Sequence, residues 1–256
     1  MAGLDREIEL ALALADAAGA IIRGYFRQRV EVIDKPDASP VTIADRDSEA
    51  AMRRLIAARF PAHGIFGEEY GADRADAEFV WVLDPIDGTK SFISGVPLFG
   101  TLIALLHRGR PVLGVLDQPV SGERWLGVEG QRTRLNGAEI RTRDCADLAA
   151  ATIFTTSPDI FSGTDAEGFA RVRAGAKLVR YGTDCYAYGL CALGFVDAVV
   201  ESGLKPYDFC ALIPIIEGAG GMVTDWRGNR PGLVTDGRIL ACGDARLHRQ
   251  LMQVLA

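Results

Sequence analysis

Apolar side chains near the start of the chain recur at the spacing of a helix. In residues 4–27 they include Leu4 and Ile8 and gather near one face, so the pattern predicts an amphipathic helix. Residues 43–58 predict a second helix. This helix ends before Pro61, because proline has no N–H to donate inside a helix. The chain is therefore expected to begin with two helices.

Uninterrupted apolar runs separated by turn dipeptides follow these helices. Residues 79–83, with the sequence FVWVL, predict a buried strand that ends at Asp84-Pro85. Arg108-Gly109 and Glu129-Gly130 each separate two such runs, so we expect a hairpin around each dipeptide. The four runs are residues 98–106, 111–116, 123–128 and 132–135, and Asn136-Gly137 is a further turn signal.

Beyond about residue 143, strand-like and helix-like segments alternate, which is typical of an α/β layer. We therefore expect an α+β lobe over residues 1–142 and an α/β lobe over residues 143–256. A groove between two lobes is a usual place for a small-molecule site. The strand-like segments are residues 151–155, 177–180, 196–200, 222–224 and 239–242, and the helix-like ones are residues 166–174, 184–193, 207–219 and 245–255.

The composition of the 256 residues is that of an ordinary globular protein, with 48% hydrophobic and 24% charged residues. The net charge of −6 argues against a protein that coats nucleic acid or lies on a membrane surface. The five cysteines form no CxxC pair and the three histidines are scattered, so we expect neither a disulfide framework nor a zinc site.

The N-terminal segment predicts neither a secretory signal nor a membrane span. Its first charges, Asp5, Arg6 and Glu7, are mixed rather than basic. The apolar residues 10–22 are interrupted by Asp16 and are fewer than the roughly 20 residues that a membrane span needs. We therefore expect a cytoplasmic protein.

The sequence WVLDPIDGT, residues 81–89, carries the strongest chemical signal. A hydrophobic strand leads Asp84 and Asp87 into a turn that contains proline and glycine. Carboxylates without histidine or cysteine suit Mg²⁺ or Mn²⁺, and backbone N–H groups at a following helix start can bind phosphate. The same residue types are common in strand caps and β-turns, so this segment alone leaves both interpretations open.

Two more acidic segments follow a similar pattern. Glu68 and Glu69 come directly after the short apolar run Ile65-Phe66. Asp208 lies in the first turn of a predicted helix, where a carboxylate interacts favourably with the helix dipole. Each of these acids, taken alone, is also typical of a helix cap or a solvated surface.

Taken in order, these segments resemble the inositol monophosphatase family, the lithium-sensitive, magnesium-dependent branch of the fructose-1,6-bisphosphatase superfamily. The resemblance spans about residues 35–221 and includes an N-terminal block in which Lys35 precedes SPVTIAD at residues 39–45. It implies a layered αβαβα sandwich and a phosphatase of small phosphate monoesters. It also implies a homodimer, while the acidic charge and the short apolar runs predict no nucleic-acid or membrane partner.

The resemblance implies a site for two or three Mg²⁺ ions, for which Mn²⁺ can substitute. Clustered cations offset the charge of a phosphomonoester, roughly −1.5 to −2 at pH 7, and activate a water molecule. Asp87 and Asp208 would also contact the substrate. The implied ligands are the side chains of Glu68, Asp84, Asp87 and Asp208 and the backbone carbonyl of Ile86.

Catalytic and phosphate-binding roles are implied for other residues of the same motifs. Thr89 would hydrogen-bond the attacking water, and Asp45 would accept a proton from Thr89. The backbone N–H groups of Gly88 and Thr89 would bind the phosphate, while Lys35 would lie at the edge of the site. The roles of Glu69, Lys90 and Arg180 stay open.

The C-terminal block resembles the histidinol-phosphate phosphatase branch of the family. Inositol monophosphatases usually have a small residue where this chain has Asp184, and Trp-Asp where it has Tyr207-Asp208. The sequence PLFGTLIALL at residues 97–106 favours the same branch. L-Histidinol phosphate carries an α-ammonium and a titratable imidazole, so Asp184 and Glu201 are candidates for charge-assisted hydrogen bonds to the cation. Asp184 also suits the N-cap of the helix that follows it, and the two roles are compatible.

Other functions stay open at this stage. One is an inositol-1-monophosphatase or a broad sugar-phosphate phosphatase, and another is a 3′-phosphoadenosine 5′-phosphate phosphatase. A third is a non-catalytic protein that binds phosphometabolites or metal. The presence of Thr89, Asp45 and every implied ligand favours an enzyme.

Overall fold

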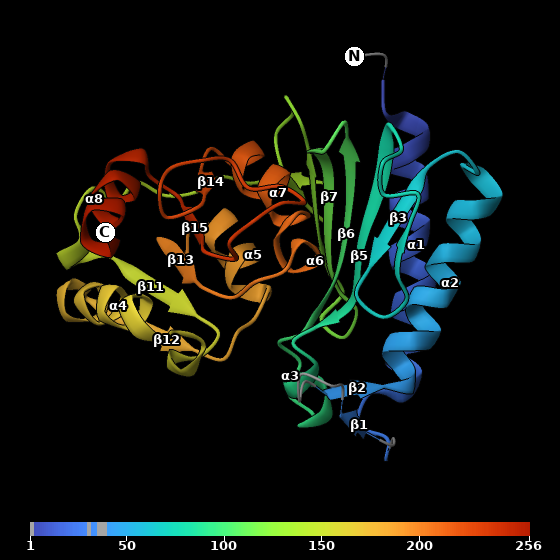
Figure 1. Cartoon of the computed structure of the whole chain (residues 1–256), viewed down its shortest axis with the longest axis horizontal. Coiled ribbons are helices and arrows are strands. Elements are labelled where there is room, and N and C mark those ends of the chain that lie inside the picture. Colours follow the sequence, from blue (N-terminus) through green and yellow to red (C-terminus); the bar gives the residue numbers. More distant parts are fainter. Residues whose placement is uncertain (1–2, 30–31, 35–39) are drawn as a thin grey trace.

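Two β-sheets and three layers of helices are stacked on one another (Figure 1). The computed structural model describes residues 3–29, 32–34 and 40–256. This arrangement confirms the predicted αβαβα sandwich. The helices are α1 (Asp5–Tyr25) and α2 (Ile43–Arg59) on one side, α5 (Tyr186–Ala192), α6 (Pro206–Phe209) and α7 (Leu212–Gly218) between the sheets, and α4 (Gly163–Gly175) and α8 (Ala245–Leu255) on the other side.

The larger sheet has eight strands in the order β10-β9-β8-β7-β6-β5-β3-β4. Its pairs are antiparallel except for β3 with β5. Arg108 and Gly109 have φ values of 49° and 77°, which suit the tight turn of the predicted hairpin. The strands are β3 (Gly64–Gly67), β4 (Gly71–Asp73), β5 (Phe79–Asp87), β6 (Gly100–His107), β7 (Arg110–Gln118), β8 (Glu123–Val128), β9 (Arg134–Leu135) and β10 (Ala138–Glu139).

The smaller sheet has five strands in the order β12-β11-β13-β15-β14. Its strands all follow residue 151, whereas those of the larger sheet all precede residue 140. The division into lobes at residue 142 stays a prediction. The strands are β11 (Thr152–Thr155), β12 (Leu178–Tyr181), β13 (Ala198–Glu201), β14 (Met222–Thr224) and β15 (Ile239–Cys242), and a separate pair consists of β1 (Val32–Asp34) and β2 (Pro40–Thr42).

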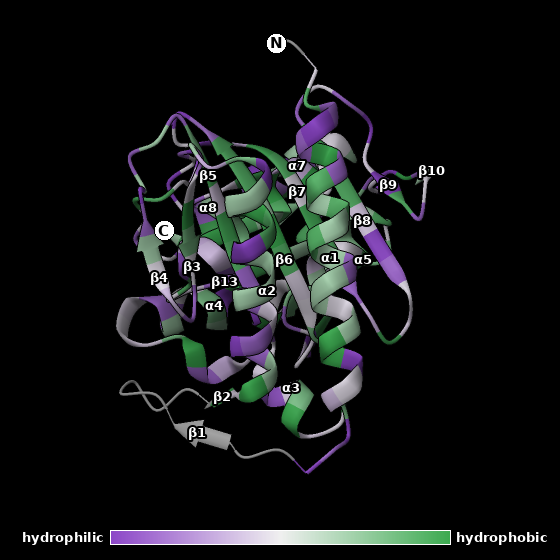
Figure 2. Cartoon of the chain, turned by 90° about the vertical axis from the view of Figure 1, so that its right-hand side faces the viewer, coloured by the Kyte–Doolittle hydropathy of each residue, from purple (hydrophilic) through white to green (hydrophobic). Residues whose placement is uncertain are grey.

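Buried apolar side chains fill the space between successive layers. One cluster joins α1 and α2 to the larger sheet, and Figure 2 shows the hydrophobic strands behind these two helices. A second cluster joins both sheets to α5, α6 and α7, and a third joins the smaller sheet to α4 and α8. Within the described residues, no helix has the length and hydrophobicity to cross a membrane.

Helix α7 lies close against the backbone of the larger sheet. A Cβ atom at Gly114 of β7 would lie 1.9 Å from the Ala211 carbonyl oxygen. A Cβ at Gly127 of β8 would lie 2.4 Å from the Ile215 nitrogen. Glycine at these two positions therefore permits the contact between the second half of the chain and the first.

Two predicted boundaries are wrong, and both involve proline. Strand β5 does not end at Asp84 but continues to Asp87, with a register shift between these residues that accommodates Pro85. The predicted helix over residues 207–219 is divided into α6 and α7. Pro214 explains this division, because it cannot donate to the Cys210 carbonyl and its ring crowds that group.

Candidate active site

Three carboxylates from distant parts of the chain meet between the two sheets. Asp84 and Asp87 lie at the end of β5, and Asp208 lies in the first turn of α6. One oxygen of each lies within 4.8 Å of the others. The extension of β5 past Asp84 therefore places both of its acids beside α6.

Backbone N–H groups orient two of these carboxylates. Asp87 Oδ2 accepts a hydrogen bond of 2.7 Å from the Cys185 N–H, and Asp208 Oδ2 accepts one of 2.7 Å from the Lys205 N–H. Asp84 is buried, and its Oδ1 has no hydrogen-bond partner among the described residues. Such support fixes the direction of a ligand while it leaves other carboxylate oxygens for a cation.

Burial and mutual repulsion raise the pKa values of all three carboxyl groups. Burial is the main cause for Asp84, and the charges of Glu68, Asp87 and Asp208 add to it. The pKa of Asp87 is raised by burial and then by Asp184 and Asp208. Burial, with Glu68 and Glu201, raises the pKa of Asp208 to about 7. A divalent cation would relieve this repulsion, and an all-oxygen donor set fits a hard ion.

Glu68 reaches this cluster from β3, the parallel neighbour of β5, and its N–H donates to the Leu83 carbonyl at 3.1 Å. The turn after it is held by Glu49, which the sequence reasoning missed. The buried Glu49 carboxylate accepts the Glu69 N–H at 2.7 Å and pairs with Arg53 at 2.7 Å. The available signal was an acid four residues after Asp45, on the same face of α2.

Asp45 and Thr89 each hydrogen-bond a different group in this structure. Asp45 Oδ2 accepts from the Thr42 N–H and hydroxyl at 2.8 and 2.6 Å in a capping box at the start of α2. Among the described residues, its buried Oδ1 has no partner. Thr89, which opens the short helix α3 (Thr89–Ile93), donates its hydroxyl to the Ile86 carbonyl at 3.1 Å. Burial, the main cause, raises the pKa of Asp45 to about 6.

The Asp184 side chain faces Gly88 and Ser91, at the start of α3, rather than its own helix. Its Oδ2 accepts a 2.8 Å hydrogen bond from Ser91 Oγ, and a Cβ at Gly88 would lie 2.8 Å from the same oxygen. The N-cap of α5 is Cys185, with no hydrogen bond from a capping side chain, so the N-cap role suggested for Asp184 is wrong. The reason is its left-handed backbone, with φ of 44°, which turns the side chain away.

Glu201 ends strand β13 and is buried beside these acids. It accepts hydrogen bonds from the Thr156 N–H and hydroxyl at 2.9 and 2.5 Å and from the Tyr188 hydroxyl at 3.0 Å. Burial raises its pKa to about 7, and the charge of Asp184 contributes. Thr156 and Tyr188 were missed because only the fold brings them to Glu201.

The remaining predicted residues have less direct connections to the cluster. Lys35 lies outside the described residues. The charge of Lys90 lowers the pKa of Asp184, which burial raises overall. Arg180 lies over the Phe154 ring, 5.8 Å from its centre.

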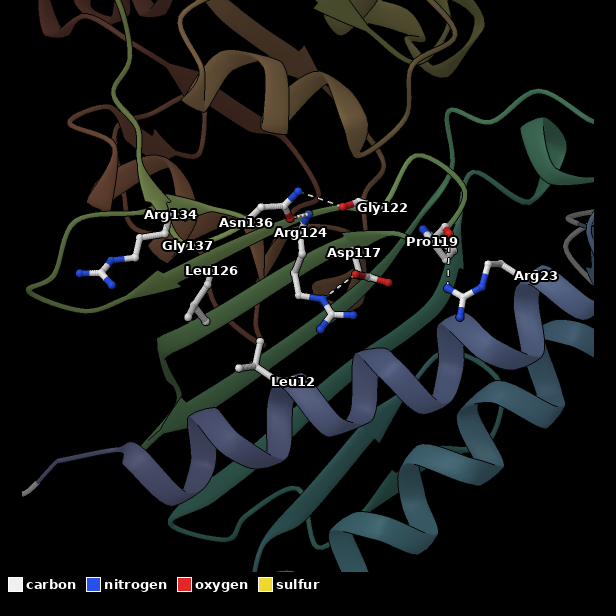
Figure 3. A pocket seen from close by; sticks show the side chains of 10 residues that line it. All are labelled: Leu12, Arg23, Asp117, Pro119, Gly122, Arg124, Leu126, Arg134, Asn136 and Gly137. Atoms are coloured by element: carbon white, nitrogen blue, oxygen red, sulfur yellow. Dashed lines mark hydrogen bonds and ion pairs between the residues drawn. The ribbon is translucent and has the colours of Figure 1, made fainter.

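A cavity of about 460 Å³ lies away from all the predicted site residues, between α1 and strands β7 to β9 (Figure 3). Arg23 and Leu12 line its helical side. Arg124 within it pairs with Asp117 at 2.6 Å and with Asp16 at 2.8 Å. Its lining carries three arginines, Arg23, Arg124 and Arg134, against one acid, Asp117, and brings no group of carboxylates together, so we place the chemistry at the carboxylate cluster instead.

Comparison with known proteins gives consistent matches over the whole chain. The sequence profile of the inositol monophosphatase family matches residues 4–256. Bifunctional phosphatase IMPL2, chloroplastic, from Arabidopsis thaliana is 52% identical, covering 98% of this chain and 75% of that relative. A histidinol-phosphatase from Chlorobaculum parvum is 37% identical, covering 97% and 96%. A solved inositol monophosphatase from Zymomonas mobilis has a TM-score of 0.92 and 46% identity, covering 100% and 99%.

Proposed function

The chain belongs to the inositol monophosphatase family and is a phosphatase, and from this premise we propose that it hydrolyses L-histidinol phosphate to L-histidinol and phosphate. The observation that carries this proposal is the position of Asp184 and Glu201 next to the three clustered carboxylates. The relative from Chlorobaculum parvum, named a histidinol-phosphatase, supports it.

The charge of the substrate explains why these two acids matter. L-Histidinol carries an ammonium group beside its phosphate ester, whereas inositol is uncharged. A carboxylate binds an ammonium by a charge-assisted hydrogen bond, which is stronger than a neutral one. Asp184 and Glu201 thus provide a reason for this chain to prefer a cationic alcohol.

We assign the metal site to Glu68, Asp84, Asp87, Asp208 and the Ile86 carbonyl, with two or three Mg²⁺ ions that Mn²⁺ can replace. The fit rests on the oxygen donor set and on the buried, unpartnered Asp84 Oδ1. When bound, these ions supply positive charge against the phosphate and lower the pKa of a water molecule.

The chain's own residues then orient the reaction. Thr89, released from the Ile86 carbonyl, hydrogen-bonds the attacking water, and Asp45 Oδ1 accepts a proton from the Thr89 hydroxyl. Backbone N–H groups of Gly88 and Thr89 hold phosphate oxygens. As the bond from water oxygen to phosphorus forms, the bond from phosphorus to the histidinol oxygen breaks. The water proton passes to Thr89 as Thr89 gives its own to Asp45, and the departing oxygen takes a proton from solvent. No covalent protein nucleophile is needed.

A substrate panel in saturating Mg²⁺ tests the proposal. We expect the highest kcat/KM for L-histidinol phosphate, compared with inositol 1-phosphate, glycerol 2-phosphate and 3′-phosphoadenosine 5′-phosphate. Asp184→Asn should reduce kcat/KM for L-histidinol phosphate far more than for glycerol 2-phosphate. A higher value for inositol 1-phosphate in the wild type would show that the assignment is wrong.

Inositol 1-phosphate is the second candidate substrate. It is favoured by the 46% identity to an inositol monophosphatase from Zymomonas mobilis. The same panel decides between the two esters.

The cellular location and the oligomeric state stay predictions. The relative from Arabidopsis thaliana is named chloroplastic, so the cytoplasmic location of this chain stays a prediction. The homodimer is also a prediction, which light scattering would test.

A further inference from the structure

A hydrogen bond connects α3, which follows Gly88, to the segment that precedes α5. Ser91 Oγ donates to Asp184 Oδ2 at 2.8 Å across 93 sequence positions. We propose that Ser91 is a positioning residue, which orients the Asp184 carboxylate so that it binds the ammonium group of the substrate. This inference rests on the proposed function and names how the site selects a cationic alcohol.

The side chain of Asp184 is held by a contact from outside its own segment. Its φ of 44° lies in the left-handed region, which non-glycine residues adopt only where surrounding structure maintains it. Helix α5 holds only its backbone, through the Ala187 N–H, which donates to the Asp184 carbonyl at 3.2 Å, and the Asp184 side chain does not cap that helix. The Ser91 hydroxyl is therefore the contact that sets the direction of this side chain.

Ser91 is in turn placed by a packed element. It lies in α3, where its neighbour Phe92 is buried. The Phe92 ring packs against Phe26 and Phe99, with centroid distances of 5.8 and 5.2 Å. The Val96 N–H also bonds the Ser91 carbonyl at 2.9 Å. The hydroxyl donor is thus held in place before any substrate binds.

The geometry leaves one oxygen of Asp184 available to a ligand. Ser91 occupies Oδ2, and no hydrogen bond to Oδ1 is present among the described residues. The charge of Asp184 acts on both Asp87 and Glu201, so its carboxylate lies near the candidate metal site and near the second substrate acid. An ammonium group at Oδ1 would be attracted by all of these carboxylates.

Gly88 sets the distance between the two subsites. Its φ of 87° and the 2.8 Å approach of its virtual Cβ to Asp184 Oδ2 exclude any side chain. The Asp184 carboxylate therefore rests against the same backbone turn that we assign to the phosphate. Ser91 thereby holds the ammonium partner at a constant separation from the phosphate.

The test compares Ser91→Ala and Ser91→Thr with a control, Ser94→Ala, which removes an exposed hydroxyl at the end of the same helix. We would measure kcat and KM in saturating Mg²⁺ for L-histidinol phosphate and for glycerol 2-phosphate, which has no ammonium. Ser91→Ala should raise KM for L-histidinol phosphate about tenfold and change kcat less than about threefold. Ser91→Thr and Ser94→Ala should resemble the wild type with both esters.

Inhibition by L-histidinol gives a second measurement that does not depend on turnover of a charged ester. With glycerol 2-phosphate as substrate, Ser91→Ala should raise the Ki of L-histidinol by about the same tenfold and leave the Ki of inorganic phosphate unchanged. In an Asp184→Asn background, Ser91→Ala should not change the Ki of L-histidinol further, since both substitutions weaken the same contact between residue 184 and the ammonium group. If Ser91→Ala does not fold, Ser91→Cys replaces the strong donor by a weak one at similar volume.

The outcomes separate the two proposals. A wild type that prefers uncharged esters contradicts the proposed function and this inference together. A wild type that prefers L-histidinol phosphate, with a Ser91→Ala variant that is unchanged or impaired equally on both esters, overturns the role of Ser91 alone. Selective loss of the cationic ester and of L-histidinol binding, restored by threonine, supports it.

Discussion

Acidic side chains in the site keep pKa values that ordinary surface acids do not have. The causes are burial first and repulsion second, and the hydrogen bonds from Thr42, Thr156 and Tyr188 only partly offset them. A buried carboxylate of this kind holds its proton until the pH approaches its raised pKa. At neutral pH the ionised, mutually repelling carboxylates therefore lower the stability of the metal-free protein, and bound cations would reduce this repulsion.

The effect of one such carboxylate on the free energy of unfolding can be measured at Glu201. Its folded pKa of about 7 exceeds the ordinary 4.5, so its stabilising contribution is complete below pH 4.5 and is lost as pH rises through 7. In EDTA, Glu201→Gln should be close to the wild type near pH 5 and more stable by about 3 kcal/mol at pH 8. Urea unfolding at both pH values checks this. A variant that loses more stability at pH 8 than at pH 5 would contradict the sign.

Asp84 should show opposite effects on stability and activity. Asp84→Asn removes a buried charge that is repelled by Glu68, Asp87 and Asp208, so the thermal midpoint in EDTA should rise. The same change should reduce Mg²⁺-dependent phosphate release roughly a thousandfold and remove the stabilisation that Mg²⁺ gives to the wild type. A variant that keeps its response to Mg²⁺ would show that Asp84 is not a ligand.

Residues within short motifs were predictable, whereas their supports were not. Asp84, Asp87 and Asp208 stand in recognisable segments, and the structure brings them together. Glu49 and Ser91 act on residues 20 and 93 positions away. Nothing in their local sequence indicates those partners, because tertiary packing alone brings them close.

At the scale of elements, apolar runs and turn dipeptides located most helices and strands. The two wrong boundaries lie where proline occurs inside a predicted element. There, tertiary contacts determine whether the strand or helix continues past the proline. Pro85 is accepted at a register shift, where its carbonyl bonds the Thr101 hydroxyl at 2.8 Å. Pro214 divides one predicted helix into two, although its flanking sequence is strongly apolar.

The contact of α7 with the larger sheet predicts a large effect from one methyl group. Gly114→Ala would place Cβ 1.9 Å from a backbone oxygen of the helix layer. We expect a loss of at least about 3 kcal/mol in unfolding free energy, because backbone cannot move aside as a side chain can. The matched control is Gly24→Ala in α1, where a Cβ meets nothing within 4 Å. Chemical denaturation should show the control to be neutral or stabilised by up to about 1 kcal/mol; equal effects would refute the packing argument.

At the scale of the whole molecule, the site has contributions from both sheets. The larger sheet supplies Asp84 and Asp87, the layer between the sheets supplies Asp208, and the smaller sheet supplies Glu201. The Cys185 N–H, at the start of α5, donates a hydrogen bond to Asp87 at the end of β5 in the larger sheet. Bound cations should therefore stabilise the packing of the larger sheet against the helices between the sheets, as well as the ligand side chains themselves.

Hydrogen exchange can test this connection. Addition of Mg²⁺ to the metal-free protein should slow amide exchange at residues 182–185 and 205–209, where N–H groups bond Asp87 and Asp208. Helix α8, outside the smaller sheet, serves as the internal control and should change little. A uniform change along the chain, or none at these two segments, would contradict the predicted coupling.

The fit of α7 against Gly114 and Gly127 also limits how such enzymes can be recombined. A chimaera that joins the first part of one relative to the second part of another, within residues 140–151, keeps every motif but mixes these contact partners. Where the donor of the first part has larger residues at the two glycine positions, the imported helix cannot settle on the sheet. Exchange of substrate preference by such a crossover therefore requires that the glycines and the helix be inherited together.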